Sequence, residues 1–238
     1  MAGYILLEGG AEFGGRMADP DRQAIALAGG PDARISIIPA AAAPDRNHER
    51  AGRNGVEWFR SLGARQVAAL PLIDRAAADR PAIVAALRES RLVYLLGGFT
   101  HYLAQTLAGS ASWQAIVEAY AAGAVVAGSS AGAMVLCQHY YDPQGRQVAA
   151  GLGLVPRACV LPHHNSFGKS WAAELAARLP ASVLIGIDEG TGMLDDGDGG
   201  RWRVLGRGSV TLYHRGRPTV YNAGASFDSE ALEVPSAG

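Results

Sequence analysis

Four short runs rich in isoleucine, valine and leucine alternate with longer amphipathic segments, and this alternation constrains the fold of the chain most. The runs are YILLEGG, RISIIPA, LVYLLGG and AVVAGSS, each ending in glycine, proline or small residues. Such runs are typical of buried parallel strands. The intervening segments have the pattern of helices, at about residues 18–28, 45–62, 77–89 and 101–122. Strands alternating with helices predict an α/β fold with a doubly wound, mostly parallel sheet flanked by helices.

The pattern changes after residue 140. ACVLP and SVLIGID are predicted to be two more strands, with a helix over SFGKSWAAELAARLP between them, and the weaker run QVAALPL predicts a further strand. Stricter alternation at about residues 200–225 predicts antiparallel strands that close the far edge of the sheet. The length of 238 residues favours a single domain over residues 1–238, with a tail that frays over residues 227–238.

Composition excludes several classes of partner. The 21 basic and 22 acidic residues nearly balance, so no broad electrostatic field is available for nucleic acid or an anionic membrane. Gly and polar residues interrupt every apolar stretch before it reaches the roughly 18 residues of a membrane span. The first residues, MAGYILLEGG, lack the basic leader and long apolar region of a secretory signal, and we expect them to form the first strand. Cys137 and Cys159 stand in apolar surroundings and are expected to be reduced thiols of a cytoplasmic protein.

The stretch GSSAG at residues 128–132 matches the G-x-S-x-G pattern of a sharp strand-to-helix turn that carries a nucleophilic serine. AVVA supplies the strand before it, and AMVLCQHYY has the character of the helix after it. Ser130 is the central residue, and its hydroxyl would project at the carboxyl edge of the sheet, where open α/β sheets bind ligands. The alternative is a glycine-rich helix entry capped by serine. A catalytic serine also needs a base and a group that orients the base.

Candidates for both groups follow predicted strands. His163 and His164 stand together in VLPHHN, and Asp188 and Glu189 end the apolar run SVLIGIDEG. The two acids also fit an ordinary solvated turn. Each of the other four histidines has the character of a surface or core residue: His48, His101, His139 and His214. Rings of adjacent histidines usually point apart and no third ligand motif accompanies them, so no metal site is expected.

The glycine pair Gly97 and Gly98 ends the run LVYLLGG. Without side chains, these residues let the backbone approach a ligand closely, although a tight strand-to-helix turn would also explain them.

Together these stretches resemble the cyanophycinase and dipeptidase E family of serine peptidases, whose fold is similar to that of class I glutamine amidotransferases. GSSAGA matches the family's elbow, LLGG its strand-end glycines, LPHH its histidine segment and GIDEGT its acidic segment. GLGLVP precedes the histidine segment, as it tends to in that family. The resemblance covers about residues 4–195.

The resemblance implies that Ser130 is the nucleophile, His163 the general base and Glu189 the carboxylate that orients the base. It further implies an oxyanion hole formed by the backbone N–H groups of Gly98 and Ala131, with no cofactor and no metal.

His163 is preferred to His164 as the base because it directly follows Pro162, whereas His164 stands where relatives tend to carry Tyr or Phe. Asp188 is assigned to holding the turn.

Departures from the family pattern concern the substrate. Phe99 and Thr100 follow the glycine pair, where cyanophycinases tend to carry Asp-Gln and the dipeptidase group Asn-Thr. Of the basic residues that often follow the cyanophycinase histidine, Lys169 alone remains. Phe99, Thr100 and His164 are therefore the candidate substrate-binding residues. Three arginines are further candidates for binding a substrate carboxylate, although they also fit solvated surface positions: Arg16, Arg46 and Arg53.

The sequence thus predicts a serine peptidase that cleaves a small peptide or isopeptide through an acyl-enzyme. Two alternatives remain open: a non-catalytic binding module on the same fold, and an esterase or amidase acting on non-peptide substrates. The resemblance also implies a homodimer.

Overall fold

The computed structural model describes residues 3–197 and 200–233, which form two β-sheets with helices packed against them. The first sheet has eight strands in the order β14 (Ser226–Asp228), β11 (Arg201–Gly206), β10 (Thr191–Asp195), β1 (Tyr4–Glu8), β5 (Val125–Ser129), β4 (Leu92–Leu95), β2 (Arg34–Ile38) and β3 (Gln66–Ala69). The second has six, in the order β13 (Arg217–Asn222), β12 (Ser209–His214), β9 (Val183–Ile187), β8 (Val155–Leu161), β6 (Cys137–Asp142) and β7 (Gln147–Ala150).

The parallel part of the first sheet is the part that the apolar runs predict. Strands β1, β5, β4, β2 and β3 are all parallel, and the weak run QVAALPL supplies the edge strand β3. Every residue of β4 and β5 is buried, because helices cover both faces of these strands. The α/β class and its mostly parallel core are therefore confirmed.

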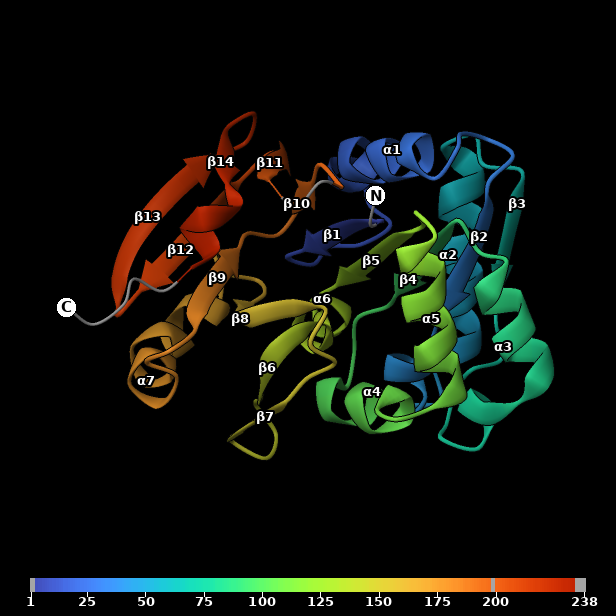
Figure 1. The fold of residues 1–238 in the computed structure, drawn as a ribbon, viewed down its shortest axis with the longest axis horizontal. Coiled ribbons are helices and arrows are strands. Elements are labelled where there is room, and N and C mark those ends of the chain that lie inside the picture. Colours follow the sequence, from blue (N-terminus) through green and yellow to red (C-terminus); the bar gives the residue numbers. More distant parts are fainter. Residues whose placement is uncertain (1–2, 198–199, 234–238) are drawn as a thin grey trace.

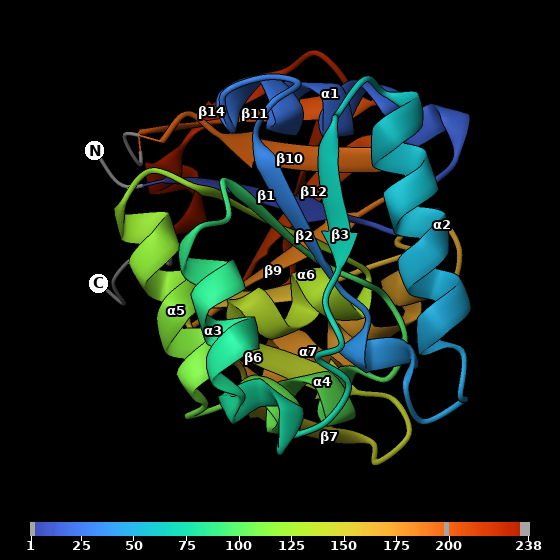
Figure 2. The same cartoon turned by 90° about the vertical axis from the view of Figure 1, so that its right-hand side faces the viewer.

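The helices divide between the two faces of this sheet. Helices α1 (Ala18–Leu27) and α2 (His48–Ser61) pack on one face, where Ala24 and Phe59 join the same apolar cluster as Leu6 of β1. The opposite face carries Ile5 and Leu7 of β1 and four helices: α3 (Pro81–Arg88), α4 (Thr100–Leu107), α5 (Ala111–Ala121) and α6 (Ala131–Leu136). Figure 2 shows α2 and α5 on opposite sides of β2 and β3.

The second half of the chain differs from the prediction of one sheet whose far edge is formed by antiparallel strands. β8 and β9 do form and pair with each other in parallel, but they belong to the second sheet, where β8 also pairs with β6. The antiparallel strands divide: β10, β11 and β14 extend the first sheet past β1, whereas β12 and β13 extend the second past β9 (Figure 1). Alternation fixes which face of a strand is buried and leaves its partner strand unspecified.

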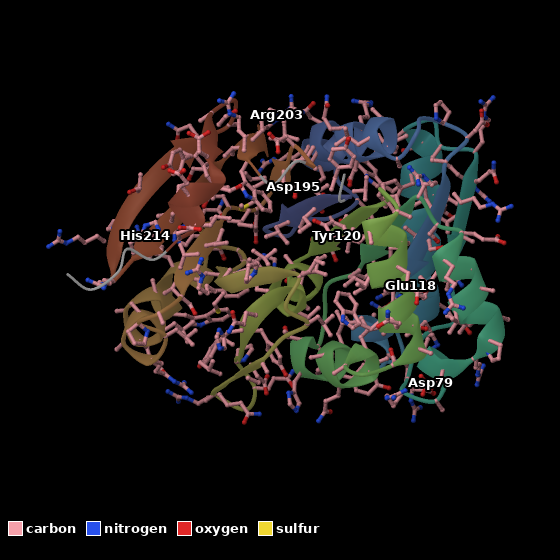
Figure 3. The ribbon with its side chains drawn as sticks, in the orientation of Figure 1. Asp79, Glu118, Tyr120, Asp195, Arg203 and His214 are labelled. Atoms are coloured by element: carbon pink, nitrogen blue, oxygen red, sulfur yellow. The ribbon has the colours of Figure 1, made fainter. Side chains whose placement is uncertain are left out.

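Side-chain hydrogen bonds connect the antiparallel extension of the first sheet to β1 and α1. Asp195, at the end of β10 and labelled in Figure 3, accepts a hydrogen bond of 2.7 Å from the Ile5 backbone N–H. Burial of this carboxyl raises its pKa to about 6. Arg203 of β11 donates to Gln23 of α1 over 3.2 Å.

Two predicted helices end earlier than the pattern indicates. The segment 101–122 is divided between α4 and α5, because Gly109 adopts a φ of 65° and the Ser110 hydroxyl caps α5 by accepting from the Trp113 N–H. The helix after GSSAG stops at Leu136, and the next residues form β6, so His139 lies on a strand.

The remaining elements are short. They are α7 (Ala172–Arg178) and the 3₁₀ turns η1 (Gly15–Met17), η2 (Ala40–Ala42), η3 (Ala77–Asp79), η4 (Gly168–Trp171) and η5 (Ser229–Leu232). Residues 227–232 of the predicted fraying tail thus contribute to β14 and η5, and residues 234–238 lie outside the described part of the chain.

A single large apolar cluster connects the two sheets. It contains Val126 of β5 and Met193 of β10 from the first sheet, and Val160 of β8 and Ile185 of β9 from the second. No helix within the described residues combines the length and apolar character that crossing a membrane requires.

Candidate active site

The turn over residues 128–132 lies between β5 and α6, as predicted. Its central residue, Ser130, has φ 50° and ψ −110°, a conformation that non-glycine residues rarely adopt and that costs energy. The Ser130 N–H donates to the Glu8 carbonyl over 3.0 Å, which fixes the turn against β1. A Cβ atom on Gly128 would lie 2.5 Å from the Gly132 carbonyl carbon, and one on Gly132 would lie 2.1 Å from the Leu95 carbonyl oxygen. Neither glycine position accommodates a side chain.

Ser130, His163 and Glu189 meet in one hydrogen-bonded chain. The Ser130 Oγ lies 3.0 Å from His163 Nε2, and His163 Nδ1 lies 2.7 Å from Glu189 Oε1. The His163 and Glu189 side chains are 21% and 38% exposed, so solvent and substrate can reach this chain. The arrangement has the geometry in which an imidazole can take a proton from a serine hydroxyl while a carboxylate holds its other nitrogen.

The histidine and the carboxylate are each fixed by the turn that follows a strand. His163 follows β8, has φ 49° and donates its backbone N–H to the Gly9 carbonyl over 2.7 Å. Glu189 follows β9, and its backbone N–H donates to the Asn165 side chain over 3.0 Å. Parallel β8 and β9 end side by side, which is why two turns that are 26 residues apart supply adjacent side chains.

Two residues of this region belong to no recognisable sequence motif. Phe167 stacks on the His163 ring with a centroid separation of 4.8 Å and an interplanar angle of 25°, yet its side chain remains 48% exposed. Asn165 holds the Glu189 backbone. Both lie within four residues of His163 in HHNSFG, so proximity along the chain is the one clue that the sequence offers.

His164 and Asp188 form a second pair, which lies inside the protein. His164 Nε2 contacts the Tyr213 hydroxyl at 2.8 Å, and its Nδ1 lies 3.4 Å from Asp188 Oδ1. Asp188 also accepts from the Ser209 N–H at 2.9 Å and hydroxyl at 2.8 Å. Burial lowers the pKa of His164, an effect that Asp188 opposes. The contacts of Asp188 fit the turn-holding role expected for it.

The segment after β4 presents backbone groups beside Ser130. The Gly98 N–H donates to no acceptor among the described residues, whereas the Phe99 N–H donates to the Ala41 carbonyl over 2.8 Å. The Ala131 N–H belongs to the first residue of α6, where a helix supplies no acceptor of its own. Both amides are therefore available to a ligand.

A cavity of about 590 Å³ opens beside Gly98. Its walls combine aromatic residues, charged groups of both signs and one side-chain amide: Glu12, Phe13, Asp45, Asn47, Arg50 and Phe99. Of the substrate-binding candidates, Phe99 lines this cavity. Thr100 is buried, with its hydroxyl 3.6 Å from the Met134 sulfur, and His164 is buried on Tyr213 and Asp188.

The three candidate arginines lie outside the lining of that cavity. Arg53 lines a separate cavity of about 630 Å³ that also includes His48. The arginine that the 590 Å³ cavity does contain is Arg50, which donates to Asn47 Oδ1 over 2.8 Å. Arg50 is on α2, three residues before Arg53, so a shift by one helical turn separates the expected residue from the observed one.

A pair of carboxyl groups is buried beneath the site. Glu8 and Asp21 are fully buried and interact with each other; the Tyr94 hydroxyl donates to Glu8, and Trp58 Nε1 donates to Asp21 over 2.7 Å. Burial raises the pKa of Glu8 well above its usual range and that of Asp21 to about 7. Glu8 Oε1 and Asp21 Oδ1 have no hydrogen-bond partner among the described residues, and the raised pKa values favour a proton held by this pair. Within that same part of the chain, no three His, Cys, Asp or Glu side chains are arranged to hold a metal ion.

Known proteins resemble this chain in sequence over most of its length. The peptidase family S51 profile matches residues 5–202. A cyanophycinase from Synechococcus elongatus is 31% identical over 221 residues, which cover 88% of this chain and 67% of the relative. A cyanophycinase from a Nostoc species is 31% identical over 220 residues, covering 87% and 72% of the two chains.

Solved structures resemble it as well. The crystal structure of a peptidase from an acI-B1 actinobacterium superposes with a TM-score of 0.86 at 32% identity, covering 96% of this chain and 97% of the other. A putative peptidase E protein from Listeria monocytogenes shares the fold, with a TM-score of 0.59 at 17% identity, covering 94% and 100%. The chain therefore belongs to peptidase family S51, a family of serine-type peptidases.

Proposed function

We propose that this serine peptidase uses Ser130 as nucleophile, His163 as general base and Glu189 as the carboxylate that orients the base. One observation carries the proposal: Ser130 Oγ lies 3.0 Å from His163 Nε2, and His163 Nδ1 lies 2.7 Å from Glu189 Oε1. The strained backbone of Ser130 supports it, because such strain persists where function requires it.

In the proposed reaction, Ser130 Oγ attacks the carbonyl carbon of the scissile amide while its proton passes to His163 Nε2. His163 then gives this proton to the leaving nitrogen, the C–N bond breaks, and the amine departs. Water attacks the remaining ester with His163 again as base, which releases the acid and restores the Ser130 hydroxyl. Glu189 stabilises the imidazolium and keeps Nδ1 protonated throughout.

The N–H groups of Gly98 and Ala131 are the proposed oxyanion hole. Among the described residues neither amide has a backbone acceptor; Ala131 directly follows Ser130, and Gly98 follows Gly97, which lies beside Ser130. Removal of one such donor in a peptidase costs about 2.7–4 kcal/mol of transition-state stabilisation, so these amides must be held rigidly.

The proposed substrate is a small peptide or isopeptide that enters the 590 Å³ cavity beside Gly98. Phe99 supplies an apolar wall. Arg50 forms no ion pair within the described residues and is the proposed partner of a substrate carboxylate. The cyanophycinase relatives share the family, but Phe99 and Thr100 replace the polar pair expected in that group, so cyanophycin itself is not the proposed substrate.

A fluorophosphonate probe, which reacts with activated serines, tests the proposal. We expect mass spectrometry to locate the adduct on Ser130, with labelling abolished in Ser130→Ala and strongly slowed in His163→Ala and Glu189→Ala. Ser61→Ala, which changes a serine on α2, is the matched control and should label normally. A folded protein that resists the probe, and that binds peptides saturably whether or not Ser130 is present, would instead be a binding module.

Matched ester and peptide substrates separate the peptidase from an esterase or amidase. We expect turnover of the peptide; kcat/KM confined to the ester would reject peptide cleavage.

A cytoplasmic location and a homodimer complete the proposal. The two cysteines, Cys137 and Cys159, are free and buried, in keeping with a reducing compartment. Sedimentation equilibrium tests the dimer, and a mass near 24.7 kDa would reject it.

A further inference from the structure

The loop that joins β1 to η1, over residues 9–14, contacts every segment of the site. The Gly9 carbonyl accepts from the His163 N–H over 2.7 Å, and the Gly10 carbonyl accepts from the Gly190 N–H over 3.2 Å. The loop also contains non-glycine residues in the left-handed region, Ala11 and Phe13, each with φ 61°. Backbone strain of this kind persists where the surrounding structure requires it, so the path of this loop is set by its contacts.

At the centre of the loop, the half-buried carboxylate of Glu12 binds two different chain segments. Glu12 Oε2 accepts from the Ser129 hydroxyl over 2.8 Å, and Glu12 Oε1 accepts from the Gly97 N–H over 3.2 Å. Gly97 also lies close to the turn, because a Cβ atom built on it would be 3.2 Å from the Ser130 Cβ. One side chain therefore bridges the end of β5 and the turn after β4.

These two segments carry the two proposed oxyanion donors. Gly98 directly follows Gly97, and Ala131 is two residues beyond Ser129. We infer that Glu12 is a positioning residue, whose carboxylate fixes the separation between the Gly98 and Ala131 N–H groups. This inference rests on the proposed function, because it assigns a role within the same site.

The charge of Glu12 does not explain its place. No Lys, Arg or His within the described residues forms an ion pair with it, and Glu8 and Asp21 are nearby acids. A negative charge next to an oxyanion opposes the development of that charge in the transition state. The benefit must come from the two hydrogen bonds, which hold the donors in place before reaction.

The variants must therefore separate the charge of Glu12 from its two hydrogen bonds. In Glu12→Gln the side-chain oxygen still accepts from the Gly97 N–H, and the NH₂ group donates to the Ser129 Oγ, because a hydroxyl is both donor and acceptor. The bridge then persists without charge. Glu12→Ala removes the bridge, and Ser129→Ala removes one of its two arms. Glu57→Ala, an exposed glutamate of α2, is the control.

The experiment measures the rate constant and the affinity of fluorophosphonate labelling at Ser130 separately. We expect the maximal labelling rate to fall about 10- to 100-fold in Glu12→Ala and less in Ser129→Ala, with probe affinity within about threefold. Glu12→Gln should keep the rate within about threefold of wild type, and Glu57→Ala should match wild type. Because Ser129→Ala acts on the other end of the bridge, its effect should largely vanish in the Glu12→Ala background.

Each outcome decides the inference. Wild-type protein that does not label would reject the proposed function itself. Labelling of Glu12→Ala at the wild-type rate would reject the positioning role alone. Loss of rate in Glu12→Gln as large as in Glu12→Ala would show that the charge of Glu12, and not its bridge, is used. If Glu12→Ala fails to fold, Ser129→Ala and Glu12→Gln still decide the question, with thermal unfolding as the check on folding.

Discussion

His163–Glu189 and His164–Asp188 are two histidine–carboxylate pairs built from neighbouring residues, yet they face in opposite directions. The first contacts Ser130 and is partly exposed; the second lies under it, with side chains only 7% and 13% exposed. His164 and Asp188 instead contact Tyr213 and Ser209 of β12. A strand end thus brings residues to one edge of a sheet, whereas the orientation of each residue in the turn decides whether its side chain contacts Ser130 or packs inside the protein.

Replacement of each histidine gives the largest contrast. We expect His163→Ala to slow fluorophosphonate labelling of Ser130 at least about 10³-fold, because it removes the proposed base. His164→Ala should keep labelling within about tenfold, since it changes only the packing beneath the site. Equal losses in the two variants, with both proteins folded by circular dichroism, would show that the two histidines do not differ in their role at Ser130.

Replacement of the two carboxylates, Glu189 and Asp188, should give the next largest difference. Glu189→Gln presents an amide to His163 Nδ1 and is expected to slow labelling roughly 10²- to 10⁴-fold with little effect on stability. Asp188→Asn weakens the contacts to Ser209 and is expected to lower the free energy of unfolding by about 1–3 kcal/mol while labelling stays within tenfold. Urea titration and labelling kinetics on the same samples test this, and an exchange of the two phenotypes would contradict it.

Glu8 and Asp21 extend the comparison to a carboxyl pair without a histidine. Because the folded protein holds their proton more tightly than the unfolded chain, the free energy of unfolding should decrease as the pH rises from about 4 to about 7. Asp21→Asn supplies a permanent donor to Glu8 and should reduce this decrease by roughly 1–3 kcal/mol. Urea unfolding at pH 5 and pH 8 measures it; identical pH profiles for the variant and wild type would show that the pair does not titrate in this range.

The smallest effect of pH on stability is expected from His164. It is opposite in sign to that of Glu8 and Asp21, because it lowers stability toward acid. Burial lowers the pKa of His164, so the unfolded chain takes up the proton more readily, and the free energy of unfolding should decrease as the pH falls from about 7 to 5. His164→Phe should remove about 1 kcal/mol or less of this acid-side loss. If His164→Phe loses stability toward acid as steeply as wild type, His164 is not the group responsible. The matched histidine control is His214→Phe, at the end of β12.

The parts of the fold that the sequence predicts are those encoded by local pattern. The apolar runs became β1, β2, β4 and β5, because a strand covered by helices on both faces must be apolar throughout. The motifs also brought Ser130, His163 and Glu189 to notice, since each follows a strand. Helix ends were less predictable: Ser110 caps α5 only because the chain turns at Gly109, a break that the apolar spacing conceals.

Contacts between distant segments account for what sequence analysis missed. Arg50, rather than Arg53, lines the 590 Å³ cavity. Which of the two does so depends on how α2 is rotated against the sheet, and the sequence does not specify that rotation. Glu12 carries no motif of its own, and its partners, Gly97 and Ser129, are 85 and 117 residues away.

Local sequence is sufficient to predict the α/β fold with its parallel core and the family of the chain, because strand burial, glycine requirements and strand-end motifs are encoded in neighbouring residues. The folded structure was needed to place the second half of the chain in its own sheet, to show that His164 packs inward against Tyr213, and to reveal that Glu12 bridges two turns. Those outcomes depend on strand pairing and side-chain direction across long separations, where alternation allows several partners and packing selects one.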